Sequence, residues 1–160
     1  RDALFANSLV GKSVGAQLRK LAADSEAALK AERATFDRDV AGFRSLQATL
    51  PAEQRNQRGA ELQQRAQGLD TKAATAQREI QGGEIQALQR ILTETTPLID
   101  AESKAQKCGV IFDVKAIFAF DNPPSMNITA AVIEKLDAKI KTIPVTRVST
   151  PATTTAAPKK

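Results

Sequence analysis

The sequence contains no histidine, tryptophan or tyrosine, and its aromatic residues are six phenylalanines. Without histidine, the chain lacks the commonest general base and metal ligand at neutral pH. Its one cysteine, Cys108, cannot form an intrachain disulfide, and no cluster of cysteines is present that could bind zinc. No serine, threonine or carboxylate has a recognisable catalytic partner. The sequence therefore predicts a protein that is not an enzyme and that uses no metal or other cofactor.

Long apolar runs are also missing. No stretch approaches the roughly 20 apolar residues that a membrane-spanning helix needs, and no charged-then-apolar signal segment opens the chain. Because the sequence begins abruptly at Arg1-Asp2, we expect residues to be missing upstream. Alanine, glutamine, lysine, arginine and glutamate dominate what is present, which is typical of long helices and coiled coils.

Residues 11–107 follow a helical pattern that reverses once. Apolar residues of the first helix recur at every seventh position: Ala22, Leu29, Phe36, Phe43 and Leu50. In a coiled coil a second apolar position falls three residues later, but here those positions are mostly polar: Ser25, Glu32, Asp39 and Leu46. Pro51 disfavours helix in the residue before it and suits the first turn of a new helix. We therefore predict a long antiparallel helical hairpin with a weak seam, which would act as a flexible arm.

Three residues break the pattern of the second helix: Gly82, Gly83 and Pro97. The two glycines together cost roughly 2 kcal/mol relative to alanines, and the proline removes a backbone hydrogen bond. Two interpretations stay open. These residues form a hinge between the arm and the rest of the chain, or they are imperfections that packing tolerates.

The formal net charge of +5 favours anionic partners. Between residues 44 and 78 six basic residues stand against three acidic ones, and the six are the predicted binding residues of the arm: Arg44, Arg55, Arg58, Arg65, Lys72 and Arg78. An ordinary solvated helix face would have a similar charge pattern. The basic residues are not interleaved with aromatic residues that could stack on bases, so we expect no nucleic-acid partner.

After residue 107 the pattern changes. The runs 110–112 and 117–120 are typical of short strands, a last helix is predicted from about 129 to 141, and 144–160 is predicted to be a disordered tail. Residues 1–10 and 108–143 would together form a small body with a short helix, two short strands and the C-terminal helix. The predicted fold is therefore α+β and mostly α, with an arm at 11–107. Strands this short need partners from other chains or from a strand that is missing here.

Four stretches occur in the order found in one known family. They are Arg1-Asp2-Ala3-Leu4-Phe5, the long polar hairpin, the two apolar runs within Gly109-Val110-Ile111-Phe112-Asp113 and Ala116-Ile117-Phe118-Ala119-Phe120, and Asn127-Ile128-Thr129-Ala130-Ala131-Val132-Ile133-Glu134-Lys135-Leu136. Together they resemble the Skp/OmpH family of periplasmic chaperones, from residue 1 to about residue 141. A strand that precedes the first stretch in the family is absent here, and neither Pro97 nor the long tail is typical of it.

The resemblance implies a homotrimer in which three chains build a small β-body that carries three helical arms. The body would use the apolar side chains Val110, Phe112, Phe118 and Phe120. It further implies an ATP-independent holdase of the periplasm, which encloses unfolded outer-membrane β-barrel proteins between its arms and prevents their aggregation. The basic residues near the arm tips would contact these clients and, transiently, an anionic membrane surface. The main alternative is a coiled-coil structural or adaptor protein of the cell envelope that binds folded partners.

Overall fold

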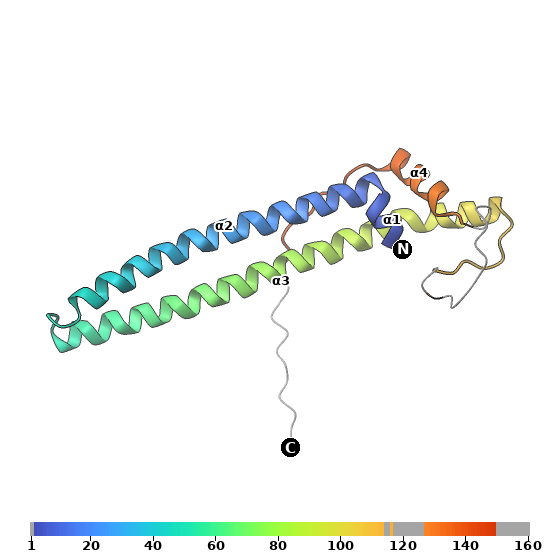
Figure 1. Cartoon of the computed structure of the whole chain (residues 1–160). Helices are drawn as coiled ribbons and strands as arrows, with labels where there is room; N and C mark the ends of the chain where they lie inside the picture. The colour runs from blue at the N-terminus through green and yellow to red at the C-terminus, as the bar shows by residue number, and fades with distance from the viewer. Residues whose placement is uncertain (1, 114–115, 117–126, 150–160) are drawn as a thin grey trace, which may run out of the picture. The chain divides into compact units, whose positions relative to one another are not determined.

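The computed structural model describes residues 2–113, 116 and 127–149. These residues form four helices: α1 (Asp2–Asn7), α2 (Leu9–Leu46), α3 (Ala52–Ala105) and α4 (Thr129–Lys139) (Figure 1). The chain divides into two compact units. One, called the core unit here, comprises Arg1–Arg19 and Gly83–Thr146. The other, called the hairpin unit, comprises Lys20–Gly82 with the residues from Arg147 onward.

The long helical hairpin is present, but the described residues form no β-body. Val110, Ile111 and Phe112 are irregular backbone, and the residues placed by the structure contain no strand. The second predicted strand, with Phe118 and Phe120, lies outside the described residues. The α+β prediction is therefore wrong, and the described part of the chain is all helical apart from turns and irregular segments. The physical reason is that a run of three apolar residues forms a strand only where a neighbouring strand accepts its backbone hydrogen bonds.

The start of α2 is fixed by side chains. Ser8 is completely buried, and its Oγ accepts a hydrogen bond from the Gly11 N–H at 3.1 Å, which is the usual arrangement of a helix N-cap. The Leu9 N–H, which has no partner within its own helix, donates to Asp137 Oδ1 of α4 at 2.7 Å. A Cβ at Gly11 would lie 1.9 Å from the Phe5 carbonyl oxygen, so the tight joint between α1 and α2 requires glycine there.

Helix α3 runs without interruption through Gly82, Gly83 and Pro97. Its C-terminal end has the geometry of a Schellman motif, because Lys107 adopts a left-handed conformation with φ of 54°. The Cys108 N–H then donates to the Ser103 carbonyl at 2.9 Å. The helix therefore ends where the sequence pattern changes.

Buried apolar side chains are concentrated in the core unit. They are Leu4, Val10, Val14, Ala87, Ile91, Val132, Leu136, Ile143 and Val145. In the described part of the hairpin unit, by contrast, Ser25 is the one buried residue. Since a buried aliphatic side chain contributes about 1.5–3 kcal/mol, hydrophobic stabilisation resides mainly in the core unit. This agrees with the rise in apolar content that the sequence shows after residue 85.

The residues around the start of the predicted tail make specific contacts. Ile143, just before the tail, and Val145, within it, are buried in the core unit. In the hairpin unit the Val148 N–H donates to the Glu79 carbonyl at 3.1 Å, and Arg147 donates to Ser25 Oγ at 2.6 Å. The segment up to residue 149 is thus held by packing and hydrogen bonds, although its composition alone predicts disorder. Residues 150–160 lie outside the described residues.

Helix α4 is tied to α3 by charged side chains. Glu102 on α3 accepts hydrogen bonds from the Lys135 ammonium of α4 and from Gln106 Nε2, and its side chain is only 10% exposed. Hydrogen bonding to Lys135 and then to Gln106 lowers the pKa of the Glu102 carboxyl, although burial by itself raises it. A second pair, Lys139 with Glu94 at 2.9 Å, joins the same two helices.

Acid should weaken this connection. Because the folded-state pKa of Glu102 lies below its unfolded value, its contribution is complete at neutral pH and is lost as the pH falls through the folded-state pKa. We expect the Glu102→Gln variant to be less stable than the wild type at pH 7, and the difference should shrink as the pH is lowered below the unfolded value of 4.5. Urea unfolding followed by circular dichroism at each pH measures this difference. Lys135→Met should flatten the pH dependence in the same way; a stability difference that does not shrink on acidification would contradict the assignment.

Candidate functional site

Three ion pairs connect α2 and α3 in the hairpin unit. Lys72 lies 2.7 Å from Glu32, Arg65 lies 2.5 Å from Asp39, and Arg33 lies 3.4 Å from Asp70. The residue numbers of the two partners add to 103 or 104 in every pair. All three pairs therefore fit one antiparallel register centred near residue 52, where the sequence predicts the reversal. Figure 1 shows the two helices side by side on either side of that turn.

The seam between these helices is only half-buried. Four of the five predicted apolar positions are half-buried and Ala22 is exposed; the half-buried ones are Leu29, Phe36 and Phe43 on α2 and Leu50 in the turn that follows it. The polar positions three residues later have a use that the sequence did not reveal. Glu32 and Asp39 supply anions to the ion pairs across the seam, and the Arg65 guanidinium lies 5.9 Å from the centre of the Phe36 ring.

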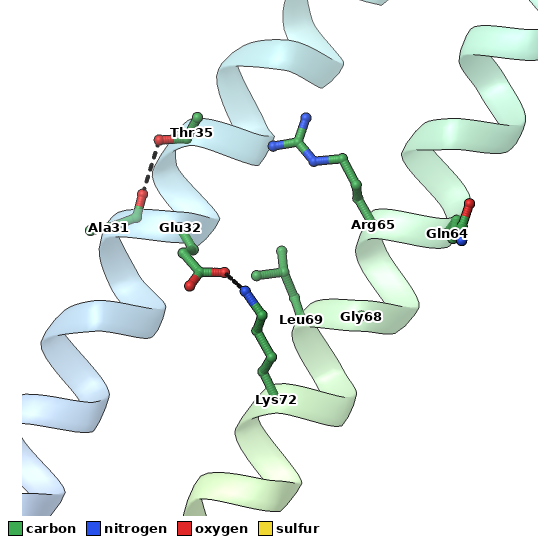
Figure 2. A pocket seen from close by; sticks show the side chains of 8 residues that line it. All are labelled: Ala31, Glu32, Thr35, Gln64, Arg65, Gly68, Leu69 and Lys72. Carbon is green, nitrogen blue, oxygen red and sulfur yellow. Dashed lines mark hydrogen bonds and ion pairs between the residues drawn. The ribbon is translucent and has the colours of Figure 1, made fainter.

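An open groove of about 620 Å³ lies between the two helices. Its walls are Ala31, Glu32 and Thr35 of α2 and Gln64, Arg65, Gly68, Leu69 and Lys72 of α3 (Figure 2). Gly68 and Ala31 leave room because they carry little or no side chain. The Lys72 and Glu32 side chains meet across the groove, and Leu69 lies beside them. The groove therefore offers a small apolar surface edged by charges that already have partners.

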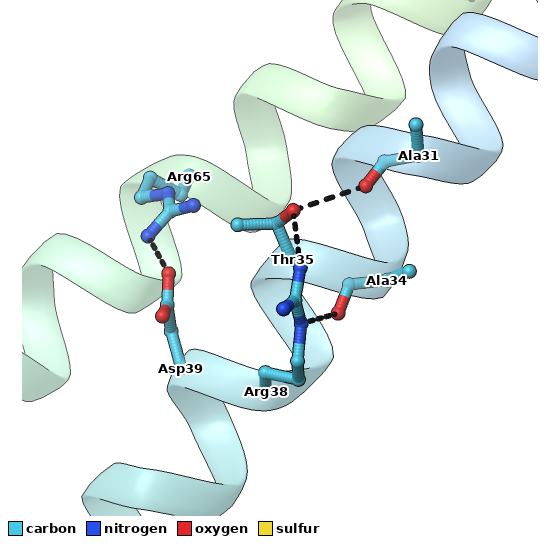
Figure 3. A network of polar contacts seen from close by, with 6 residues as sticks. All are labelled: Ala31, Ala34, Thr35, Arg38, Asp39 and Arg65. Atoms are coloured by element: carbon cyan, nitrogen blue, oxygen red, sulfur yellow. Dashed lines mark hydrogen bonds and ion pairs between the residues drawn. The ribbon is translucent and has the colours of Figure 1, made fainter.

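Polar side chains beside the groove fold back onto their own helix. Thr35 Oγ1 donates to the Ala31 carbonyl at 3.1 Å and accepts a hydrogen bond from Arg38 Nη2, also at 3.1 Å (Figure 3). Arg38 Nε donates to the Ala34 carbonyl at 3.2 Å. Consequently the Arg38 guanidinium makes its contacts within α2, while Arg65 is the cation that reaches across to Asp39.

The six predicted basic residues fall into two groups. Arg65 and Lys72 are paired across the seam, and Arg78 donates to the Ala74 carbonyl and to Thr75. The other three make no ion pair with any residue that the structure describes: Arg44, Arg55 and Arg58. Arg44 and Arg58 are exposed and Arg55 is half-buried. These three flank the turn between α2 and α3, so the predicted binding residues that make no ion pair within the described part of the chain lie near that turn.

Gly83 has a packing role in addition to its predicted role in a hinge. It is buried, and a Cβ at this position would lie 2.2 Å from the Thr146 carbonyl oxygen. The boundary between the two units on α3 falls between Gly82 and Gly83, whereas the exposed Pro97 lies further along within the core unit. The hinge at Gly82, Gly83 and Pro97 stays a prediction, since one conformation does not test motion.

The apolar residues predicted to form the body are exposed where they are described. Val110 is 68% exposed and Phe112 is 65% exposed, with Ile111 between them at 42%. Phe118 and Phe120 lie outside the described residues. Three consecutive exposed apolar side chains are unusual for a surface that stays in contact with water.

Other kinds of site find no support in the residues that the structure describes. They contain no group of three or more histidine, cysteine or acidic side chains that could hold a metal ion. None of the helices in this part of the chain is both long and apolar enough to cross a membrane.

The sequence profile of the family described as outer membrane protein (OmpH-like) matches residues 1–136. The chain belongs to the OmpH-like family. Its structure is also similar to the crystal structure of a protein from Caulobacter crescentus assigned as an OmpH-like outer membrane chaperone, with a TM-score of 0.84 and 33% sequence identity. That likeness covers 91% of this chain and 85% of the other. No curated protein matches the sequence significantly. The family resemblance inferred from the sequence is thus confirmed for this OmpH-like chain.

The seam ion pairs should set the register of the OmpH-like hairpin while adding little stability. Their side chains are about half exposed, and exposed pairs typically contribute about 0.2–1 kcal/mol. In a double-mutant cycle of Glu32→Gln and Lys72→Met, urea unfolding should give a coupling free energy below about 1 kcal/mol at low salt, and less at high salt. The Lys20–Asp24 pair within α2 provides a control with similar exposure. A coupling of several kcal/mol would show that the seam depends on charge.

Proposed function

We propose that this protein is an ATP-independent holdase chaperone of the periplasm that encloses unfolded outer-membrane proteins between helical arms. The observation that carries this proposal is the hairpin unit, a long pair of helices in which Ser25 alone, among the described residues, is buried. Such an arm presents nearly all of its side chains to its surroundings. Membership in the OmpH-like family supports the same function.

The arm surface suits many weak contacts. The groove between α2 and α3 is open, small residues such as Ala31 and Gly68 line it, and its cations are already paired. No large aromatic side chain forms an anchor there, so no single contact would bind tightly. An unfolded chain that touches several such surfaces is nevertheless retained, because linked weak contacts act at high effective concentration. Each contact breaks easily, so a client leaves without nucleotide hydrolysis once its insertion into the membrane depletes the unbound form.

The free charge at the turn would assist capture. Arg44, Arg55 and Arg58 have no ion-pair partner among the described residues, and they stand together at the end of the hairpin unit. Fixed positive charge accelerates the encounter with acidic clients and attracts an anionic membrane surface. We therefore assign the first contact with either partner to these three arginines.

A homotrimer would account for the exposed apolar residues of the core unit. Val110, Ile111 and Phe112 are exposed in the single chain, and association of three copies would remove them from water. Three chains would also bring three arms together around one client. In this arrangement Val110 and Phe112 are contacts between copies, made without the β-strand that the sequence predicts for them.

Capture of an unfolded client tests the proposed function directly. A denatured outer-membrane barrel protein diluted into buffer should scatter less light when a molar excess of this chain is present. The variant R44Q/R55Q/R58Q should slow capture roughly threefold or more at low salt, and the difference should disappear as salt screens the charges. The variant K20Q/R38Q/R78Q removes the same charge from cations of the hairpin unit that already have contacts and lie outside the groove, and it should behave nearly like the wild type.

Unchanged aggregation in the presence of folded chain would rule out the holdase. A chain that binds folded envelope proteins but ignores unfolded ones would instead support the structural or adaptor function. If both triple variants slowed capture equally, capture would depend on the net charge of the chain and not on the arginines at the turn.

The trimer has its own test. Light scattering coupled to size-exclusion chromatography should give three times the mass of one chain for the wild type and a single-chain mass for V110S/F112S. Ile85→Ser is the matched control. It changes an exposed apolar residue that lies elsewhere, on α3, and should leave the trimer intact. A wild-type mass other than three chains would contradict the homotrimer.

A further inference from the structure

A side-chain amide holds the segment after α4 by its backbone. Gln17 Nε2 donates to the Ile143 carbonyl at 2.9 Å, and Gln17 Oε1 accepts a hydrogen bond from the Val145 N–H at 3.0 Å. A residue of a neighbouring parallel strand would bond to the same two backbone groups, one on either side of Pro144. Gln17 thus makes the two backbone hydrogen bonds that a neighbouring strand would make. Neither bond involves a side chain of the segment.

The side chains of the segment alternate between inside and outside. Ile143 is 2% exposed and Val145 is 9% exposed, whereas Pro144 and Thr146 are exposed. This is the period of two that an extended chain has when one face is buried. Ser13 Oγ lies 2.9 Å from the Thr142 Oγ1 at the start of the segment.

Gly83 allows the segment to lie close against α3. A Cβ there would lie 2.2 Å from the Thr146 carbonyl oxygen and 3.5 Å from a methyl carbon of Val145. The backbone of the segment therefore approaches α3 more closely than any other residue type would allow. Ser13, Gln17 and Gly83 are called the slot below, and all three belong to the core unit.

A site that bonds to backbone groups and buries every second side chain fits one class of ligand. It would accept an extended polypeptide with apolar residues at alternate positions, which is the pattern of the strands of outer-membrane barrels. We propose that the slot is a binding site for such segments of an unfolded client, and that residues 142–146 occupy it as a tethered substitute until a client displaces them. The identity of the client rests on the chaperone function proposed above.

Because residues 142–146 are attached to the same chain as the slot, they would limit which clients can enter it. An occupant attached to the same chain acts at an effective concentration in the millimolar range. A free peptide competes poorly against it, whereas a client already held by the arms is present at a comparable effective concentration. The segment follows α4 and forms no helix or strand of its own, so none of the four helices has to unfold for it to leave. The slot would therefore favour clients that are held at several points.

A reversible lock on the full chain tests this proposal. Because Ser13 Oγ and Thr142 Oγ1 are neighbours, S13C/T142C should form a disulfide that closes the slot, in a Cys108→Ser background that removes the native thiol. The affinity for a fluorescently labelled, urea-denatured outer-membrane barrel protein is measured by anisotropy with the lock oxidised and reduced. We expect the oxidised form to bind about tenfold more weakly. The C108S chain alone should not respond to oxidation.

A second measurement reports displacement itself. The lock should form several-fold more slowly when the reduced chain is saturated with client, because the client would hold Thr142→Cys away from Ser13→Cys. An unchanged rate with client bound, or equal affinity of the locked and unlocked forms, would overturn the proposal while leaving the holdase function in place. Absence of client binding in every form would instead reject the holdase function, and this proposal with it.

Substitutions that empty the slot provide a test without a disulfide. I143S/V145S removes the two buried side chains of the segment and should raise client affinity severalfold, with helical content unchanged by circular dichroism. P144S/T146S changes the exposed positions of the same segment and is the matched control, which should bind like the wild type. If I143S/V145S binds client no better than P144S/T146S does, the segment is a structural brace and the proposal fails.

Discussion

Two long helices in the hairpin unit stay together without a buried apolar core between them. A half-buried apolar seam supplies part of the attraction, and three exposed ion pairs fix which residue lies opposite which. Neither contribution is large, because exposed ion pairs are weak and half-buried side chains gain only part of the hydrophobic stabilisation. The arm can therefore present almost its whole surface to a partner. Its single register follows because the half-buried seam contacts and the three ion pairs all favour the same alignment of the two helices.

The core unit follows different physics. Its helices bury aliphatic side chains, and its polar groups are satisfied by specific partners such as the Glu102–Lys135 pair and the Gln17 clamp. Backbone groups and charges that are buried in this way are costly to leave unpaired, so they define positions more sharply than the arm's contacts do. The protein thus combines a firmly specified part with a weakly specified one. In the proposed holdase, the weakly specified part would adapt to clients of varied sequence.

Local pattern in the sequence predicted the elements whose causes are local. Pro51 marked the reversal, and the apolar residues at every seventh position from Leu29 to Leu50 marked the seam. The ion pairs were not predicted, although Glu32 and Asp39 stood at positions where a coiled coil expects apolar residues, because their partners lie about 26 to 40 residues away. The same limit applies to the basic residues. Sequence could group Arg44 with Arg65, but only the structure separates the free cation from the paired one.

The strand prediction at 110–112 is wrong, and the contacts of residues 144–149 were not predicted, for related reasons. Three apolar residues at 110–112 have strand propensity, yet propensity forms a strand only where a neighbouring strand is present. The residues from 144 onward are polar on average, but Ile143 and Val145 alternate with exposed residues, and Gln17 hydrogen-bonds to the backbone of both. Average composition does not register that alternation. The deciding partner, Gln17, lies 126 positions from Ile143 in the sequence.

The hydrogen bond from the Leu9 N–H to Asp137 joins residues that are 128 positions apart. Most contacts within residues 20–82 can form by zipping outward from the turn near residue 52, which is a route with short loops at every step. The core unit has no such route. Its two segments, Arg1–Arg19 and Gly83–Thr146, must close one long loop before contacts between them can stabilise either segment. The arm should therefore form early in folding and the core unit late. Where synthesis or export delivers the chain from its N-terminus, the hairpin unit should therefore form before the core unit.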